Sequence, residues 1–222
     1  MNNHFISKRK NTMAKFLTTA LAICLISVAV TAAAEAPDAL VKRVSEEVLN
    51  TVNTDKDIQS GNKKKVFELV ENKIFPYVDF QRTTSMTAGR YWRQATPEQQ
   101  QKLANEFRRL LINTYAGAIS KAKNHKINFK PFRGSPTDTE VEVRSQVIQP
   151  GGEPIELDYR LEKTSAGWKI YDLNILGAWL IETYKQTFAN EISKSGIDGL
   201  IKTLEDKNNR LARSPTASKE EK

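Results

Sequence analysis

An alternating stretch decides the fold of this chain: IELDYRLE, residues 155–162. Ile155, Leu157, Tyr159 and Leu161 occupy every second position, and acidic or basic side chains fill the positions between them. Because successive side chains of a β-strand point to opposite faces, this period of two predicts a strand with one buried and one solvated face. Such a strand is typical of an antiparallel sheet that packs one face on a core.

Further strand segments flank this stretch. Upstream, Ile127 and Phe129 alternate with polar residues, and residues 141–148 carry valines at alternate positions before the PGG turn at 150–152. Downstream, the SAG turn at 165–167 leads into residues 168–176, which are apolar on both faces and therefore expected at a more central place in the sheet. The acids of these strands all fall on the face predicted to be solvated.

Helical periodicity dominates on both sides of the strands. Apolar residues recur every fourth position over residues 40–52, a second helix is expected up to Ile74, and Asp79 can cap a short one. The run TPEQ at 96–99 is typical of a capping box that starts a long helix. A last pair of helices begins at Ala178 and is broken at Gly196. This order predicts an α+β fold with helices covering a strongly curved, mainly antiparallel sheet.

The N-terminus reads as a secretory signal peptide over residues 1–34. A basic segment precedes an apolar run at residues 16–30, and Ala32-Ala33-Ala34 has the small side chains of a cleavage site. The run is shorter than the about 20 residues of a membrane span, so cleavage near Ala34 is favoured over a retained anchor. Lipidation at Cys24 is disfavoured because Ile23 stands where a small residue is expected.

The chain expected after cleavage holds few side chains that could do chemistry. It loses Cys24, the only cysteine, and His4, which leaves His125 as the one histidine. The net charge falls from +8 to +4 because the removed segment carries four cations and no acid. Phosphate-binding loops, serine elbows and metal-ligand clusters are missing from the sequence. A binding protein without metal or cofactor is therefore favoured over an enzyme, in one domain at 35–205 before a disordered polar tail at 206–222.

Charge gives little sign of a nucleic-acid partner. The densest basic run, residues 63–65, stands at the expected start of a helix. It is interpreted as a solvated helix face, and a patch for anionic lipid or nucleic acid is the alternative.

Several motifs occur in a characteristic order. They are PYV at 76–78, Gly89-x-Tyr91-Trp92 leading into ATP at 95–97, residues 107–115, LDYRL at 157–161, GWKIYDL at 167–173 with Ile175 and Gly177, and GIDGL at 196–200. Together they span residues 39–204 and resemble the MlaC family, the periplasmic phospholipid-binding proteins also called toluene-tolerance auxiliary proteins. Each motif is weak alone, and the ordered set is specific.

The resemblance implies a function and a destination. Members of this family are monomeric periplasmic carriers that move phospholipids between an outer-membrane lipoprotein–porin complex and an inner-membrane ABC transporter complex, which maintains outer-membrane lipid asymmetry. The implied fold is an NTF2-like cone with a deep apolar cavity for acyl chains. No cofactor is implied beyond the bound phospholipid.

The cavity wall is expected to combine inward strand residues with aromatic and aliphatic helix positions. These candidate lipid-binding residues are Phe75, Phe107, Leu111, Tyr115, Val143, Val147, Leu157, Tyr159, Ile170, Leu180, Tyr184 and Phe188. Ordinary core packing is an equally good reading of each, because periodicity identifies a buried face without saying what covers it. Arg90, Arg93 and Arg160 are candidates for headgroup contacts, with a surface role as the alternative.

Two other classes of function stay open. One is an enzyme on the same kind of cone, which would need an inward carboxylate or histidine on the sheet. The other is a periplasmic adaptor or chaperone that binds polypeptide.

Overall fold

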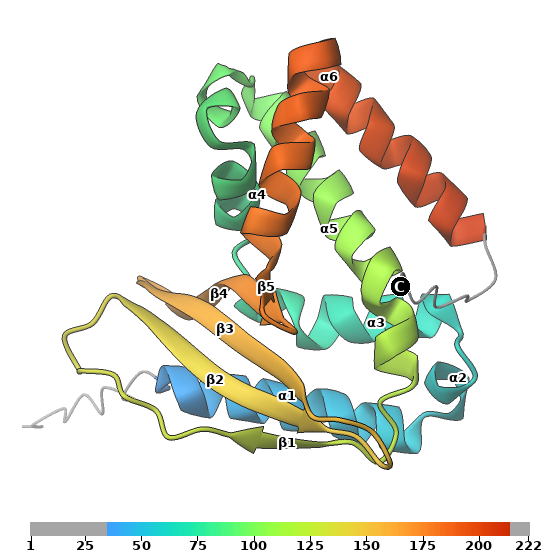
Figure 1. Cartoon of the computed structure of the whole chain (residues 1–222), viewed down its shortest axis with the longest axis vertical. Coiled ribbons are helices and arrows are strands. Elements are labelled where there is room, and N and C mark those ends of the chain that lie inside the picture. The colour runs from blue at the N-terminus through green and yellow to red at the C-terminus, as the bar shows by residue number, and fades with distance from the viewer. Residues whose placement is uncertain (1–34, 214–222) are drawn as a thin grey trace, which may run out of the picture. The chain divides into compact units, whose positions relative to one another are not determined.

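A computed structural model describes residues 35–213 of the chain. Helices come first, a sheet follows, and a long helix ends the described part (Figure 1). The elements are α1 (Pro37–Thr54), α2 (Lys56–Gln59), α3 (Lys63–Lys73), η1 (Phe75–Tyr77), α4 (Phe80–Ala88), η2 (Gly89–Gln94), α5 (Pro97–Ser120), β1 (Lys126–Phe129), β2 (Glu140–Ile148), β3 (Ile155–Thr164), β4 (Gly167–Ile175), β5 (Ala178–Trp179) and α6 (Leu180–Arg213). The predicted α+β class is confirmed. The predicted signal peptide lies outside the described residues.

The five strands form one antiparallel sheet in the order in which they occur along the chain. The alternating stretch is β3, and its Tyr159 pairs with Val143 of β2 and Leu173 of β4. The register with β4 shifts between Arg160 and Leu161. A bulge of this kind bends a strand and increases its twist, which accounts in part for the curl of the sheet.

Helix α1 covers the apolar face of the sheet, where it runs along β1 and β2 in Figure 1. The cluster that results contains Leu40, Val41, Val44, Val143, Tyr159, Leu161 and Ile170, all of them buried. The apolar stripe of α1 and the alternating residues of β2 and β3 therefore bury each other, as their periods of about four and of two predict.

The opposite face of the sheet is less solvated than its sequence indicates. Asp158 of β3 and Asp172 of β4 are both buried, although alternation places them among the charged side chains. The chain after β4 returns along this face: Trp179 of β5 pairs with Asn174, and the Arg160 guanidinium lies 3.7 Å from the centre of the Trp179 ring. The expectation that the strand acids are all exposed is therefore wrong for Asp158 and Asp172. Asp158 accepts a hydrogen bond from the backbone N–H of Ser145, and Asp172 accepts one from the N–H of Ile181 at the start of α6.

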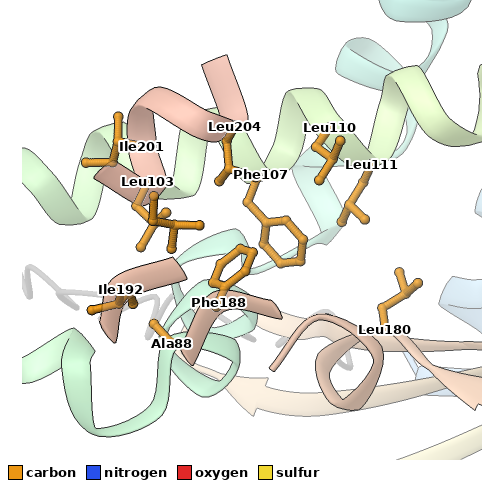
Figure 2. Close-up of a cluster of buried hydrophobic side chains, with 11 residues drawn as sticks. Ala88, Leu103, Phe107, Leu110, Leu111, Leu180, Phe188, Ile192, Ile201 and Leu204 are labelled. Atoms are coloured by element: carbon orange, nitrogen blue, oxygen red, sulfur yellow. The ribbon is translucent and has the colours of Figure 1, made fainter. Parts of the chain in front are cut away.

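A second layer consists of helices α4, α5 and α6 around an aromatic cluster. Phe107 of α5 and Phe188 of α6 are completely buried, and their rings meet edge to face with centroids 4.9 Å apart. Figure 2 shows both rings between the two helices, with leucines and isoleucines on either side. Tyr184 contacts the Phe107 ring at 5.0 Å. A third cluster joins α1, α2, α3 and α5 through Val52, Ile58, Val66 and Ile112, among others.

The predicted helix boundaries follow their capping residues. Thr96 accepts a hydrogen bond from the backbone N–H of Gln99, whose side chain accepts one from the N–H of Thr96, so the capping box is confirmed. Asp79 caps α4 by accepting from the N–H of Arg82 at 2.8 Å. At Gly196 the backbone has φ +72° and ψ −176°, which interrupts the helical conformation of α6 as predicted.

Two predicted boundaries need correction. Ala178 and Trp179 form the short strand β5, and the helix begins at Leu180. The disordered tail expected from residue 206 does not hold for residues 206–213, which continue α6. Asn208 is fully buried there, and its side-chain amide donates to the Glu106 carbonyl at 2.8 Å. The polar composition of this segment is typical of disorder, but the buried amide network holds it on α5. Among the helices of residues 35–213, none has the length and apolarity to cross a membrane.

Candidate functional site

A small apolar cavity lies between the helices and strand β4 of the sheet. Its volume is about 120 Å³. Residues from six elements and the segments next to them line it: Val70, Ile74, Phe75, Val78, Phe80, Thr83, Leu111, Ile112, Tyr115, Ile119, Ile170, Tyr171, Asp172, Leu173 and Leu180. Four consecutive residues of β4 belong to this set. Because neighbouring side chains of a strand point to opposite faces, a cavity that touches all four lies beside β4 and not over one face of the sheet.

Thr83 and Asp172, two polar residues of the lining, direct their polar atoms into hydrogen bonds within the protein. The Thr83 hydroxyl donates to the Tyr171 carbonyl at 2.7 Å. The Asp172 carboxylate accepts from the backbone N–H groups of Leu173 and Ile181, at 3.0 and 3.1 Å. The surface that remains toward the cavity is carbon, which suits an apolar guest and gives water few partners.

A larger, more open groove of about 430 Å³ adjoins the cavity. Its lining is Phe75, Val78, Asp79, Phe80, Gln81, Gln101, Ala104, Asn105, Arg108, Thr164 and Lys169. Phe75, Val78 and Phe80 line both spaces, so the groove and the cavity share one wall. Apart from this wall the groove is mostly polar, with two cations and one carboxylate.

Two aromatic rings form the centre of the shared wall. Phe75 and Phe80 meet edge to face, with centroids 4.8 Å apart and ring planes at 82°. The Arg108 guanidinium lies 4.8 Å from the centre of the Phe75 ring, on the side of the groove it lines. The Lys169 ammonium donates to the Pro76 carbonyl at 2.5 Å. The wall is thus apolar toward the cavity and is bordered by positive charge toward the groove.

The structure brings five of the twelve candidate lipid-binding residues to the cavity: Phe75, Leu111, Tyr115, Ile170 and Leu180. Phe107, Tyr184 and Phe188 belong to the aromatic cluster, which shares Leu111 and Leu180 with the cavity wall. Val143, Leu157 and Tyr159 pack in the cluster that α1 covers, and Val147 is half-buried on β2. The candidates therefore divide between the cavity, the helical core beside it and the contact of the sheet with α1.

The three candidate arginines lie elsewhere than the groove. Arg90 and Arg93 are exposed on η2, where Arg90 stacks on Tyr91. Arg160 stacks on Trp179 and lies 3.4 Å from the buried Asp172 carboxylate. The cations that border the apolar wall are Arg108 and Lys169, which the sequence reasoning missed. A signal for Arg108 was its position between Ala104 and Leu111, on the apolar side of α5.

Burial changes the acid–base behaviour of two lining residues. Desolvation raises the pKa of Tyr115 to about 12, with a smaller contribution from Tyr184. Desolvation also raises the pKa of Asp172, against the hydrogen bonds from Ile181 and Leu173 and the nearby Arg160, all of which lower it. Asp172 is the inward carboxylate that an enzyme on this fold would need. Its carboxylate accepts hydrogen bonds from backbone N–H groups, so its role in this structure is to link the start of α6 to β4.

Clusters of three or more potential metal ligands do not occur among residues 35–213. His125 lies in the turn after α5, where its backbone N–H donates to the Ala122 carbonyl, and it is not part of either space.

The sequence is similar to those of known phospholipid-transport and toluene-tolerance proteins. A family model described as MlaC protein matches residues 42–206. The chain is 24% identical over 201 residues to the intermembrane phospholipid transport system binding protein MlaC of Haemophilus influenzae, covering 89% of this chain and 92% of that protein. It is 26% identical over 176 residues to the toluene tolerance protein ttg2D of Pseudomonas putida, covering 79% of this chain and 81% of that protein.

A solved structure extends the likeness to three dimensions. The phospholipid-binding protein from Ralstonia solanacearum, solved in complex with a phospholipid, is 51% identical to this chain with a TM-score of 0.76. The match covers 79% of this chain and 98% of that one. A family match over most of the described residues and a shared fold lead to the same result: the chain belongs to the MlaC protein family.

Proposed function

We propose that this protein is a soluble phospholipid carrier that takes acyl chains into the apolar cavity and leaves the headgroup in the adjoining groove. The observation that carries the proposal is the pairing of a carbon-lined cavity with a polar, cation-bearing groove across one wall. A phospholipid has the same division between apolar chains and a charged phosphate. The Ralstonia relative, which was solved with a phospholipid, supports the assignment.

The physical need for such a carrier follows from the hydrophobic effect. Each methylene kept out of water is worth about 0.8 kcal/mol, so a two-chain lipid does not cross an aqueous gap unaided at a useful rate. An apolar cavity in the protein would shield the acyl chains from water during the crossing. This task requires no catalytic group and no cofactor other than the lipid, so we do not assign an enzymatic activity.

The cavity is too small for a lipid in the described conformation. An apolar cavity of about 150 Å³ accommodates a benzene molecule, and the present one measures about 120 Å³. We propose that α3, α4, α5 and α6 move apart from β4 on uptake, which produces the deep cavity of a cone-like fold. Phe107, Tyr184 and Phe188 would then join the lipid contact, since they pack against the present lining.

The setting of this carrier completes the proposal. The names of the relatives refer to intermembrane phospholipid transport and to toluene tolerance. We propose that the protein is exported after cleavage near Ala34 and acts as a monomer in the periplasm, between an outer-membrane lipoprotein–porin complex and an inner-membrane ABC transporter complex. Transport between these complexes would maintain outer-membrane lipid asymmetry.

Lipid extraction tests the carrier directly. The purified protein is extracted with organic solvent and the extract analysed by mass spectrometry, with about one phospholipid per chain expected. A lipid-free protein that also takes no labelled phospholipid from vesicles would contradict the proposal. Co-purified peptides would favour a polypeptide-binding adaptor instead.

A cavity-filling substitution locates the site. Leu111→Phe adds bulk to the cavity wall, so uptake of labelled phospholipid should fall, whereas Met86→Phe adds the same ring at an exposed position on α4 and should leave uptake unchanged. Equal uptake by the two variants would place the lipid elsewhere.

A further inference from the structure

The short segment η1 is held by three cations that come from three different elements. The Arg108 guanidinium of α5 lies over the Phe75 ring, and the Lys169 ammonium of β4 binds the Pro76 carbonyl. Arg43 of α1 donates to the Tyr77 hydroxyl at 3.2 Å and lies 4.8 Å from the centre of its ring. No side chain of η1 is fully buried. These polar contacts therefore hold η1 in place together with the packing of Phe75 and Tyr77 and the backbone bridge of Val78 to Ile170.

Two of these cations line the groove, and both have hydrogen-bonding capacity to spare. The Arg108 Nε–H is buried and has no hydrogen-bond partner within the described residues. The ion pair of Arg108 with Glu71 is 3.3 Å long and partly exposed, which makes it weak. Lys169 has three N–H donors, and the Pro76 carbonyl takes one of them.

Phe75 joins η1 to the apolar cavity. Its ring stands against Phe80 in the wall that the groove and the cavity share. Phe80 packs with the helical core around Phe107, whereas Phe75 packs with the cluster of α3 and α5. The two rings thus belong to separate clusters that meet at the wall, so a displacement of η1 would part them and connect the two spaces.

We propose that Phe75 and Phe80 form the closed gate of the cavity, and that a phosphodiester bound in the groove by Arg108 and Lys169 opens it by drawing both cations away from η1. The inference rests on the proposed carrier function and names how its site is controlled. The ligand is the phosphate of a lipid headgroup, and free phosphate is the other source of the same chemistry.

The relative strengths of the contacts give the direction of the switch. Hydrogen bonds from arginine or lysine to phosphate are charge-assisted, and arginine makes them in bidentate pairs. A cation–π contact and a single bond to a neutral carbonyl are weaker, so the phosphate displaces both. Once released, Phe75 no longer closes the wall and acyl chains follow the headgroup into the cavity. A lipid without phosphate meets a closed gate.

Lipid uptake by charge-neutralised variants tests the coupling. Purified protein is mixed with phosphatidylethanolamine–phosphatidylglycerol vesicles that carry either a fluorescent phospholipid or a fluorescent diacylglycerol with the same chains. Arg108→Gln and Lys169→Gln should each slow phospholipid uptake about fivefold or more, the factor expected for losing one charged contact. Diacylglycerol uptake should not slow. Lys102→Gln, on the exposed side of α5, is the matched control for charge.

The gate has its own test. Phe75→Ala should raise the uptake of diacylglycerol, also in the Arg108→Gln background, because the wall is then open without phosphate. Glycerophosphoglycerol, a diester without acyl chains, should accelerate uptake of the apolar dye Nile red by the wild-type protein and not by Arg108→Gln. Acceleration by inorganic phosphate alone would assign the groove to free phosphate and overturn the proposal.

The outcomes separate this inference from the carrier function. If the wild-type protein takes up no phospholipid, the carrier function fails. If it does, and Arg108→Gln and Lys169→Gln match Lys102→Gln, the carrier function stands and the gate is wrong. Unfolding midpoints of all variants are measured so that a variant that unfolds is not counted, and Arg108→Lys, which keeps the charge, should recover part of the phospholipid uptake.

Discussion

The carboxylate of Asp172 in β4 accepts a hydrogen bond from the backbone N–H of Ile181 in the first turn of α6, at 3.1 Å. The same side chain accepts from the N–H of Leu173 and lies 3.4 Å from Arg160. A single side chain therefore joins the last long strand to the helix that follows it, at the border of the apolar cavity. Asp172 therefore has a structural role, in which its hydrogen bonds stabilise the link between β4 and α6 and the burial of its charge is unfavourable.

Substitutions of Asp172 should separate the contribution of its hydrogen bonds from the cost of burying its charge. Asp172→Ala leaves two backbone N–H groups without an acceptor and should lower the free energy of unfolding by about 2–4 kcal/mol. Asp172→Asn keeps a carbonyl acceptor and removes the buried charge, so its loss should be smaller. Urea unfolding measures the free energy of unfolding of both variants. A larger loss for Asp172→Asn than for Asp172→Ala would contradict the structural role of the hydrogen bonds.

The pH dependence of stability should report the raised pKa of Asp172. Because the native carboxyl holds its proton more tightly than the unfolded one, whose pKa is about 3.9, stability declines as pH rises from there through the raised native pKa. Asp172→Asn lacks this decline. The difference in unfolding free energy between the wild-type protein and Asp172→Asn should shift in favour of the variant over this range, and parallel curves would show that the pKa is not raised.

Tyr115 should produce a similar decline on the alkaline side. Its phenol ionises near pH 10 in the unfolded chain and at about 12 in the native protein, so stability falls as pH rises between these values. Tyr115→Phe removes this contribution, which we set at about 1–2 kcal/mol since the ring is only partly buried. Unfolding at pH 9 and pH 11.5 measures the difference between the two proteins. An equal loss in both would contradict the burial of the phenol.

Truncation of the aromatic cluster should be costly. Phe107 has no exposed surface, and Phe107→Ala should lower the free energy of unfolding by about 3–5 kcal/mol through lost burial and the cavity left behind. Met86→Ala, at a side chain that is 39% exposed, should change it by less than about 0.5 kcal/mol. Chemical denaturation of both variants provides the comparison, and similar losses would argue against the described packing.

Gly196 should resist substitution for conformational reasons. An added Cβ would meet no atom within 4 Å, but the backbone has φ +72°, which side-chain-bearing residues rarely adopt. Gly196→Ala should therefore cost about 1–3 kcal/mol without any steric clash. Thermal unfolding measures this cost. An unchanged or higher melting temperature would indicate that α6 continues straight through this position.

Sequence patterns predicted the elements well because each depends on neighbours along the chain. The alternation in residues 155–162 forms a strand, and Thr96 and Gln99 exchange the bonds of a capping box. The place of the cavity depends on contacts between distant elements. Tyr159 and Ile170 have the same periodic signal, yet one contacts α1 and the other also reaches the cavity.

Charged residues were the hardest to place from sequence. Asp172 lies on a face of alternating charge and is buried, because the start of α6 lies against it. Arg108 lies on the apolar side of α5, and its guanidinium lies over the Phe75 ring on η1. In both cases the deciding contact is made with another element, so the periodicity of one helix or strand does not identify the partner.

The cavity touches four consecutive residues of β4 because it lies beside that strand and not over one face of the sheet. On this side of β4, strand β5 pairs only with Asn174 and Ile175, and Val78 bridges only Ile170. Helices can therefore retreat from the residues between them while the ladder between β3 and β4 keeps every hydrogen bond. The volume of the cavity would then adapt to the bound acyl chains, because the sheet does not fix it. A container built in this way would accept chains of different length and unsaturation with the same backbone.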